Sequence, residues 1–371
     1  MKFIKRFPFL FIFISLLSIL FIYNNISTKN KNLGYVNVYN WYGMIPMDVI
    51  GDFEKETGIK VRYDYYDSNE ILEAKLFASN SGYDVVFPSA MPYIPRQIEA
   101  GAYREIKKEL IPNVKYLDKN LLKKVEIADP SNKFSIPLYW GTFGVIVDVD
   151  SVKKIIGNIP DDPFNMIFDP KIMEKLYKGG VTFLEESADV YPLTYLFLNL
   201  KLSDSSHESL DKATKYLKKL RPFITRFSGS GVIDETVRGE SILAMSWSGE
   251  GFRACENARS VGKNLSFFTP KNNPLIWLDM IAIPSGAPNV ESAHKFINFI
   301  LRPDICARLS NYSKLATTNR KSWSMVDKSI MGKSEIFPND NIIEKSFMAY
   351  PRSNDFYKKR NTLWTMVKFN L

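Results

Sequence analysis

The chain has 371 residues, of which 45% are hydrophobic and 24% are charged, and this balance excludes a disordered chain, a collagen-like repeat and a disulfide-stapled scaffold. It holds only two histidines and two cysteines, so neither a multi-histidine metal site nor a cysteine zinc cluster is expected. The formal charge is +9, but residues 1–33 hold five bases and no acid, which leaves 44 bases against 40 acids, or +4, for the rest. The lysine pairs are scattered along the chain, which indicates solvated helix faces and no nucleic-acid surface.

The N-terminus has the order of a secretory signal: a basic start from Met1 to Arg6, an apolar run from Phe7 to Tyr23 and a polar, lysine-rich stretch. The apolar run is slightly long for a signal core and slightly short for a membrane span. No small-x-small cleavage site and no lipobox cysteine follow it. Residues 1–32 are therefore a cleaved signal peptide, which we favour, or an uncleaved N-terminal anchor. In both cases the folded part starts near Leu33 and lies in an oxidising compartment.

Strands and helices alternate from Tyr35 onward. The hydrophobic spacing predicts a strand ending at Asn40-Trp41, a helix ending at Gly58, a strand over 59–65, a helix after an Asp67/Glu70 capping box and a short buried strand over 84–87. Further buried strands are predicted over 181–184, 242–245 and 275–283, with helices over 211–220 and 291–301. This order predicts a parallel α/β sheet, and two α/β lobes fit the length better than one large sheet.

Ligands of open parallel sheets bind beyond the carboxyl ends of the strands. That rule selects tryptophans, carboxylates and a serine, namely Trp41, Ser89, Glu185, Glu186, Asp189, Trp247, Glu250, Trp277 and Asp279. Tryptophans and carboxylates together suit an organic cation, because ring faces attract the positive charge and acids accept its N–H groups.

Each of these residues also has a structural interpretation. Burial in the core explains any one tryptophan at least as well as ligand binding does. Solvation or helix capping can explain the acids. Glu250 is the best candidate for capping, because Ser248-Gly249-Glu250-Gly251 opens a predicted helix. Asp279 is the hardest to explain structurally, since it interrupts an apolar strand, where a carboxylate is costly unless it is paired.

No catalytic constellation competes with this interpretation. Ser248-Gly249 is not part of a nucleophile elbow, and the serine- and glycine-rich stretch 228–231 lacks the lysine of a phosphate loop. Cys255 and Cys306 are either structural thiols or one disulfide, and the sequence does not decide between them. We therefore expect no enzyme, no cofactor and no metal.

Several strings in a fixed order carry a family resemblance. They are Tyr39-Asn40-Trp41, Phe53-Glu54-Lys55-Glu56-Thr57-Gly58-Ile59-Lys60-Val61, Asp67-Ser68-Asn69-Glu70, Val86-Phe87-Pro88-Ser89-Ala90, Trp247-Ser248-Gly249-Glu250 and Asp279-Met280. Because of these strings, the chain from about Val36 to Lys368 resembles the periplasmic polyamine-binding proteins of bacterial ABC importers. Within that family it resembles the putrescine-binding branch most.

The resemblance implies an α/β fold of the periplasmic binding protein type II, with two lobes joined by a crossing-strand hinge near Tyr139-Trp140-Gly141-Thr142. It implies lobe 1 over 33–140 plus 279–323 and lobe 2 over 141–278 plus 324–371. The implied ligand-binding residues are Trp41, Ser89, Asp189, Trp247, Glu250, Trp277 and Asp279. The implied function is a solute-binding receptor that delivers putrescine or spermidine to an ABC transporter permease in the inner membrane. We expect a monomer that binds no nucleic acid.

The sequence departs from the family pattern at one end of the expected pocket. After the first tryptophan it has Tyr42-Gly43-Met44, where the family has a hydroxyl residue, an acid and a tyrosine. Leu315 replaces another tyrosine, and Glu250 replaces an aspartate. These changes leave open a receptor for another organic cation. An alternative of a different class is a membrane-anchored polyamine sensor without transport.

Overall fold

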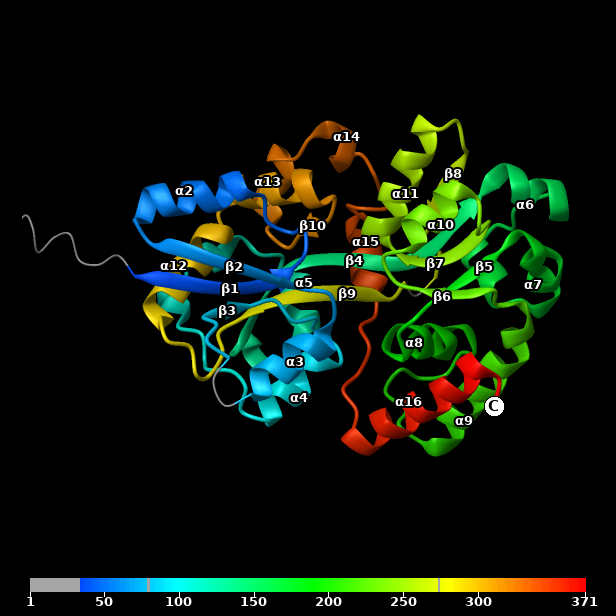
Figure 1. Ribbon diagram of the computed structural model, residues 1–371, viewed down its shortest axis with the longest axis horizontal. Coiled ribbons are helices and arrows are strands. Elements are labelled where there is room, and N and C mark those ends of the chain that lie inside the picture. Colours follow the sequence, from blue (N-terminus) through cyan, green and yellow to red (C-terminus); the bar gives the residue numbers. More distant parts are fainter. Residues whose placement is uncertain (1–33, 79–80, 273) are drawn as a thin grey trace, which may run out of the picture.

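A computed structural model describes residues 34–78, 81–272 and 274–371. The predicted export signal, residues 1–32, lies outside these ranges. Figure 1 shows two α/β halves side by side, connected by long strands that run through the middle of the molecule. Within the three described ranges, no helix combines the length and the apolar character that crossing a membrane requires.

The first half begins as the sequence predicts. Its first elements are β1 (Tyr35–Trp41), α2 (Met47–Thr57), β2 (Lys60–Tyr66), α3 (Asn69–Phe77) and β3 (Val85–Val86). Gly58 ends α2 in the left-handed conformation, with φ of 70°, which glycine adopts without strain. The capping box was assigned wrongly: Ser68 caps α3, because its Oγ accepts a hydrogen bond from the Ile71 N–H.

The strands form one hydrogen-bonded path in the order β2-β1-β3-β9-β4-β7-β5-β6. Its other members are β4 (Ser135–Asp148), β5 (Val181–Leu184), β6 (Arg226–Ser228), β7 (Leu243–Trp247) and β9 (Ile276–Ala282), while β8 (Leu265–Phe268) and β10 (Ala316–Thr317) pair with β4 off the path. Strands β1, β2 and β3 are mutually parallel, as are β5, β6 and β7. The prediction of a parallel sheet is wrong in the centre, where β9 and β4 run antiparallel to their neighbours.

Helices cover both halves of this sheet (Figure 1). The remaining α-helices are α4 (Tyr93–Glu99), α5 (Lys119–Val125), α6 (Val149–Ile156), α7 (Pro170–Leu176), α8 (Ser187–Phe197), α9 (His207–Leu220), α10 (Val232–Arg238), α11 (Ser248–Ser260), α12 (Val290–Ile300), α13 (Pro303–Ser313), α14 (Lys328–Met331), α15 (Asp340–Lys345) and α16 (Asn354–Phe369). Short 3-10 turns lie at 108–110, 112–116, 130–132, 163–167, 177–179, 221–223 and 320–325.

Each of the two α/β halves has its own hydrophobic cluster. Residues of β5, β7, α8 and α9 form one large cluster together with Phe356 and Trp364 of α16. Residues of β1, β3, α2, α12 and α13 form another. Cys255 and Cys306 are buried, free and in different clusters, so the disulfide that the sequence left open is absent.

The exact division into lobes stays a prediction. The packing supports one change to it, because residues from Val326 to Met348 join a cluster that contains Leu121 and Trp140. We therefore propose that this segment belongs to lobe 1, and that only α16 returns to lobe 2. Below, lobe 1 means 34–140, 279–323 and 326–348, and lobe 2 means 141–278 and 354–371.

The chain passes between the lobes in three places. The first is the 14-residue strand β4, whose early part pairs with β9 and whose late part pairs with β7 and β8. The second leads into β9, and the third follows α15. The second and third connections are hydrogen-bonded to each other: Ile276 N donates to Phe347 O at 2.8 Å, and Phe347 N donates to Pro274 O at 2.9 Å. The connections are thus few, extended and hydrogen-bonded to one another, as in a hinge.

Candidate functional site

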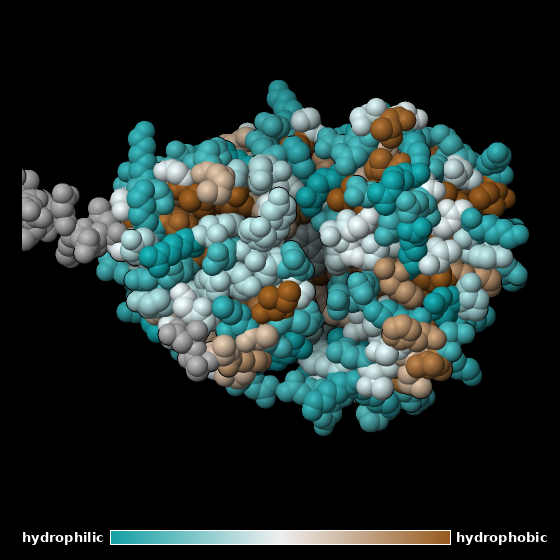
Figure 2. Space-filling model, viewed as in Figure 1, coloured by the Kyte–Doolittle hydropathy of each residue, from teal (hydrophilic) through white to brown (hydrophobic). Residues whose placement is uncertain are grey.

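A cavity of about 660 Å³ lies between the lobes and is lined by residues of both. Figure 2 shows the surface hollowed along the line where the two halves meet. This cavity is lined by all seven residues that the family resemblance implies, namely Trp41, Ser89, Asp189, Trp247, Glu250, Trp277 and Asp279. Their convergence is confirmed, and their role in binding a ligand stays a prediction.

The lining of the cavity is strongly acidic. Its acids are Asp67, Glu70, Glu185, Glu186, Asp189, Glu250 and Asp279. Arg253 is the only base among the described lining residues, so seven acids against one base give a formal lining charge of −6. The whole chain, in contrast, carries +9. A cleft with charges of one sign focuses the electric field, and this cleft therefore attracts cations.

Asp279 is the deepest of these carboxylates. It lies on β9, is 7% exposed, and its Oδ1 accepts a hydrogen bond from Ser89 Oγ at 2.8 Å. Asn69 of α3 holds Ser89 in turn: Asn69 Nδ2 donates to Ser89 Oγ at 3.1 Å, and Asn69 Oδ1 accepts from Ser89 N at 3.0 Å. Burial raises the pKa of Asp279 to about 7, with Glu250 adding to the rise and the Ser89 hydrogen bond opposing it. No lysine or arginine of the described residues forms an ion pair with it.

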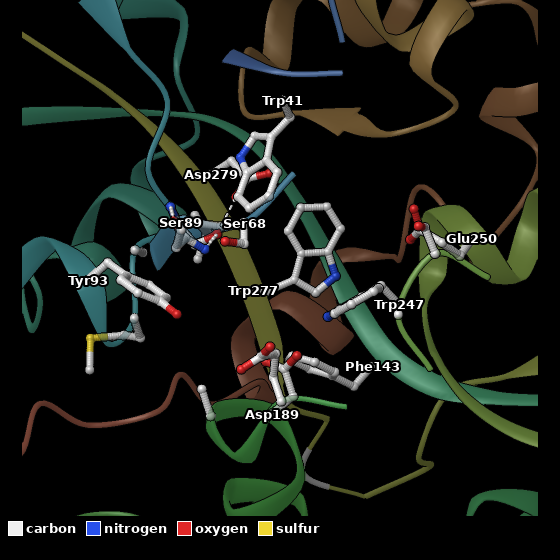
Figure 3. A pocket seen from close by; sticks show the side chains of 18 of the residues that line it. Trp41, Ser68, Ser89, Tyr93, Phe143, Asp189, Trp247, Glu250, Trp277 and Asp279 are labelled. Carbon is white, nitrogen blue, oxygen red and sulfur yellow. Dashed lines mark hydrogen bonds between the residues drawn. The ribbon is translucent and has the colours of Figure 1, made fainter. Parts of the chain in front are cut away.

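Asp189 faces the same cavity from lobe 2. It lies in the first turn of α8, just beyond the end of β5. Burial raises its pKa to about 7, and Glu186 raises it further, whereas Arg360 and a hydrogen bond with Trp247 act in the opposite direction. Figure 3 shows Asp189 and Asp279 on opposite sides of the space beside Trp277. The two carboxylates therefore offer charge from both lobes to one bound molecule.

Three indole rings form the apolar part of the cavity. Trp41 ends β1, Trp247 ends β7 and Trp277 lies on β9 (Figure 3). The Trp277 ring packs against the core clusters of both lobes. Its position depends on Gly141 of β4, because a β-carbon at residue 141 would lie 2.5 Å from Trp277 Cζ2. Aromatic walls beside carboxylates can hold a hydrocarbon chain that ends in a cationic group.

Glu250 has a different environment from the one that the sequence predicts. Its carboxylate does not cap α11: it accepts a charged hydrogen bond from Arg253 Nη2 at 2.8 Å, one turn along the same helix. The Glu250 side chain is 15% exposed and that of Arg253 is 37% exposed. The capping interpretation is therefore wrong, and this carboxylate is already neutralised within the protein.

Several lining residues were not selected from the sequence. Tyr93 of α4 donates to the Glu70 carboxylate, and both line the cavity together with Phe143 and Asn69. The strand-end rule selects Glu186, although the family resemblance does not, and its pKa is raised by burial and by the nearby Glu70 and Glu185. Nothing in the sequence placed α4 beside the cavity, so Tyr93 had no detectable signal.

The departures from the family pattern also lie at this cavity. Met44 and Leu315 line it, as does Tyr42, which is exposed. Gly43 is not among the lining residues and has φ of 71°, a conformation in which most other residues are strained. An acid placed at residue 43 would thus be strained and would start outside the cavity lining.

The raised pKa of Asp279 predicts how stability depends on pH in the absence of ligand. An unfolded aspartate titrates near 3.9, so between about pH 4 and pH 7 the folded state holds a proton that the unfolded state has lost. The free energy of unfolding should therefore fall as the pH rises through this window, by about 1–4 kcal/mol from this group. Thermal unfolding of the wild type and of Asp279→Asn at pH 5 and pH 8 measures the effect. A pH dependence identical in the two proteins would show that Asp279 is not a desolvated acid.

Comparisons with known proteins agree with this geometry. The model of the family described as bacterial extracellular solute-binding protein matches residues 48–329. The putrescine-binding periplasmic protein PotF of Escherichia coli is 36% identical over 337 residues, which are 90% of this chain and 91% of PotF. The putrescine-binding periplasmic protein SpuD of Pseudomonas aeruginosa is 34% identical over 90% of this chain and 91% of SpuD.

Solved structures share the fold. The spermidine/putrescine ABC transporter substrate-binding protein PotD of Streptococcus pneumoniae superposes with a TM-score of 0.77 at 23% identity, covering 91% of this chain and 99% of PotD. A structure from Listeria monocytogenes superposes with a TM-score of 0.78 at 28% identity, covering 91% of this chain and 99% of that one. The predicted α/β fold of the type II binding proteins is thus confirmed.

Proposed function

Because the chain belongs to the family of bacterial extracellular solute-binding proteins, we propose that it is a periplasmic receptor for putrescine or a related polyamine. It takes up the amine between its lobes and delivers it to an ABC importer. The observation that carries this proposal is the cavity itself, whose acids outnumber its bases by seven to one and which holds the buried carboxylate of Asp279 without a cationic partner among the described residues. A polyamine is the kind of ligand that supplies both the missing charge and an apolar chain.

In this proposal the seven residues have different roles in binding the amine. Asp189 and Asp279 accept the N–H groups of the ammonium, and Ser89 orients the Asp279 carboxylate. The indoles of Trp41, Trp247 and Trp277 cover the methylene chain and exclude water, while Glu250 closes one end together with Arg253. Excluding water strengthens each ion pair because it lowers the local dielectric constant. For a ligand of putrescine's size the binding free energy is limited to about −9 kcal/mol, a Kd of roughly 0.1–1 µM.

Charge also links binding to closure of the lobes. Glu70 and Asp279 face the cavity from lobe 1, and Asp189 and Glu186 face it from lobe 2. When the cavity is empty, these like charges repel one another and favour separation of the lobes. A bound cation removes the repulsion only when both lobes contact it. The closed form therefore binds the cation more tightly than the open form, and this difference in affinity drives closure. The extended connections through β4 and Phe347 are the places where such a motion would bend.

Two other functions of the same site remain as alternatives. One is a receptor for another organic cation, which the changes at Met44 and Leu315 leave open, and the other is a membrane-anchored polyamine sensor without transport. In the proposed function the partners are the amine and the permease in the inner membrane, and the protein acts as a monomer that catalyses no reaction, binds no nucleic acid and needs no cofactor. Neighbouring genes for an ATPase and a permease would favour the receptor over the sensor.

A panel of ligands tests the class of molecule bound. Putrescine, spermidine and agmatine should raise the unfolding temperature of the purified full-length protein, because a ligand bound only by the folded state stabilises it by mass action. Maltose and leucine, which carry no net positive charge, should leave the temperature unchanged. Stabilisation by maltose or leucine with none by any amine would contradict the proposed function.

A further inference from the structure

The ion pair between Glu250 and Arg253 makes the cavity asymmetric. Arg253 is the one base of the described lining, and it contacts the acid that the family resemblance assigns to the ligand. The pair carries no net charge. Of the other acids, Glu186 and Glu70 both raise the pKa of Asp189, whereas Glu250 acts on Asp279. In Figure 3 Glu250 lies on the opposite side of the Trp247 and Trp277 indoles from Tyr93.

Apolar side chains reinforce the difference at the Glu250 end. Leu315 packs on the backbone beside Glu250, because a β-carbon at Gly249 would lie 2.2 Å from Leu315 Cδ2. Met44 and Leu315 both line the cavity and pack in the same cluster as the Trp277 ring. A second ammonium placed at this end would lose its hydration and would meet an ion pair and the apolar Leu315 side chain, so its desolvation would not be compensated.

Arg253 has further hydrogen-bond donors at this end. Its side chain is 37% exposed, a guanidinium carries five N–H groups, and the one hydrogen bond that the structure shows it donating runs from Nη2 to Glu250. A protonated amine has no lone pair and cannot accept from them, whereas an amide oxygen can. A ligand that carries an acceptor at this end can therefore form a charge-assisted hydrogen bond with Arg253, whereas a second ammonium cannot.

We propose that Arg253 determines specificity and selects a diamine with one free ammonium and one uncharged, acceptor-bearing end, such as a mono-N-acylated diamine, over the free diamine. The ammonium lies between Asp189 and Asp279, the methylene chain crosses the Trp277 ring, and the acyl oxygen meets Arg253. This inference rests on the proposed function, because it concerns the same cavity and names the member of the amine class that the cavity prefers.

Calorimetric titration of three proteins with putrescine and with N-acetylputrescine tests the proposal. The proteins are the wild type, Arg253→Gln and Arg259→Gln, where Arg259 is an exposed residue of the same helix that does not line the cavity. The wild type should bind N-acetylputrescine more tightly than putrescine. Arg253→Gln frees the Glu250 carboxylate and should shift the ratio of the two affinities toward putrescine by about tenfold, the size expected for one partly desolvated charge pair.

The control separates a local effect from a general change of charge. Arg259→Gln removes the same charge from α11 and should leave the ratio unchanged within about twofold, as expected for a screened surface charge. A wild type that binds putrescine more tightly than the acetylated amine, or equal effects of Arg253→Gln on both ligands, would overturn the inference and leave the proposed function standing. Absence of binding by both amines would overturn the two together.

Discussion

Replacing Asp279 with asparagine should weaken binding of the most tightly bound amine by about 2–5 kcal/mol, as expected when a buried charge pair loses one partner. The amide oxygen of the new side chain would still accept the hydrogen bond from Ser89, so the geometry of the hydrogen-bonded chain through Asn69 should survive. What the variant loses is the negative charge beside the ligand's ammonium. The unliganded protein should keep its stability at pH 8 or gain some, because a desolvated carboxylate is removed. Calorimetry gives the affinity and thermal unfolding gives the stability.

Asp67→Asn is the matched control for this variant. Asp67 also lines the cavity, but it is exposed to solvent, where an ion pair contributes only about 0–1 kcal/mol. Its replacement should therefore change the affinity far less than Asp279→Asn. If the two variants bound the amine equally well, the charge of the buried carboxylate would not matter and Asp279 would be a structural residue.

Replacing Gly141 with alanine should lower amine affinity by more than tenfold while costing about 1–3 kcal/mol of stability, the usual range for overpacking in a core. The added β-carbon would lie 2.5 Å from both Trp277 Cζ2 and Ser248 Oγ, distances at which one of these side chains must move. Of these two side chains, the Trp277 ring borders the cavity and therefore has free space into which it can move. A displaced ring would fill part of the volume that the amine chain needs.

Gly229→Ala provides the comparison. Gly229 also lines the cavity, but a β-carbon there would meet no heavy atom within 4 Å, and its φ is not in the left-handed region. This variant should bind the amine as the wild type does. Titration of both variants, together with tryptophan fluorescence to follow Trp277, checks the argument. Wild-type affinity in Gly141→Ala would mean that the position of the Trp277 ring is not critical for binding.

Local structure was predictable wherever residue pattern alone decides it. The strand over 181–184 was predicted at its observed bounds, because a short run of β-branched and apolar residues next to glycines has few alternatives. The rule of strand ends selects nine residues, and all nine line the cavity, although β9 is antiparallel to its neighbours. Asp279 also stands out for a second reason: a carboxylate inside an apolar strand needs a functional explanation wherever that strand lies.

The interactions that could not be predicted from the sequence depend on side-chain conformation or on packing between segments far apart in the chain. Glu250 had two interpretations, a helix cap and a ligand contact; the structure shows that it accepts from Arg253 and does not cap α11, and its contact with a ligand stays a prediction. Tyr93 comes from α4, a short helix with no pattern that would aim it at the cavity. Glu70 was interpreted as a capping residue, whereas Ser68 caps α3 and Glu70 accepts from Tyr93. The packing of 326–348 against Trp140 likewise joins residues far apart in the chain.

In the proposed mechanism an amine binds by taking the place of the protons on Asp189 and Asp279. Both carboxyls have a pKa raised to about 7, so at pH 7 each is close to half protonated in the empty cavity. Contact with an ammonium lowers both pKa values, and binding should then release about one proton in total. Titration of the protein with its preferred amine at pH 7, in two buffers of different ionisation enthalpy, counts these protons directly. Release of about one proton is the predicted result, and binding with no proton release or with proton uptake would contradict this mechanism.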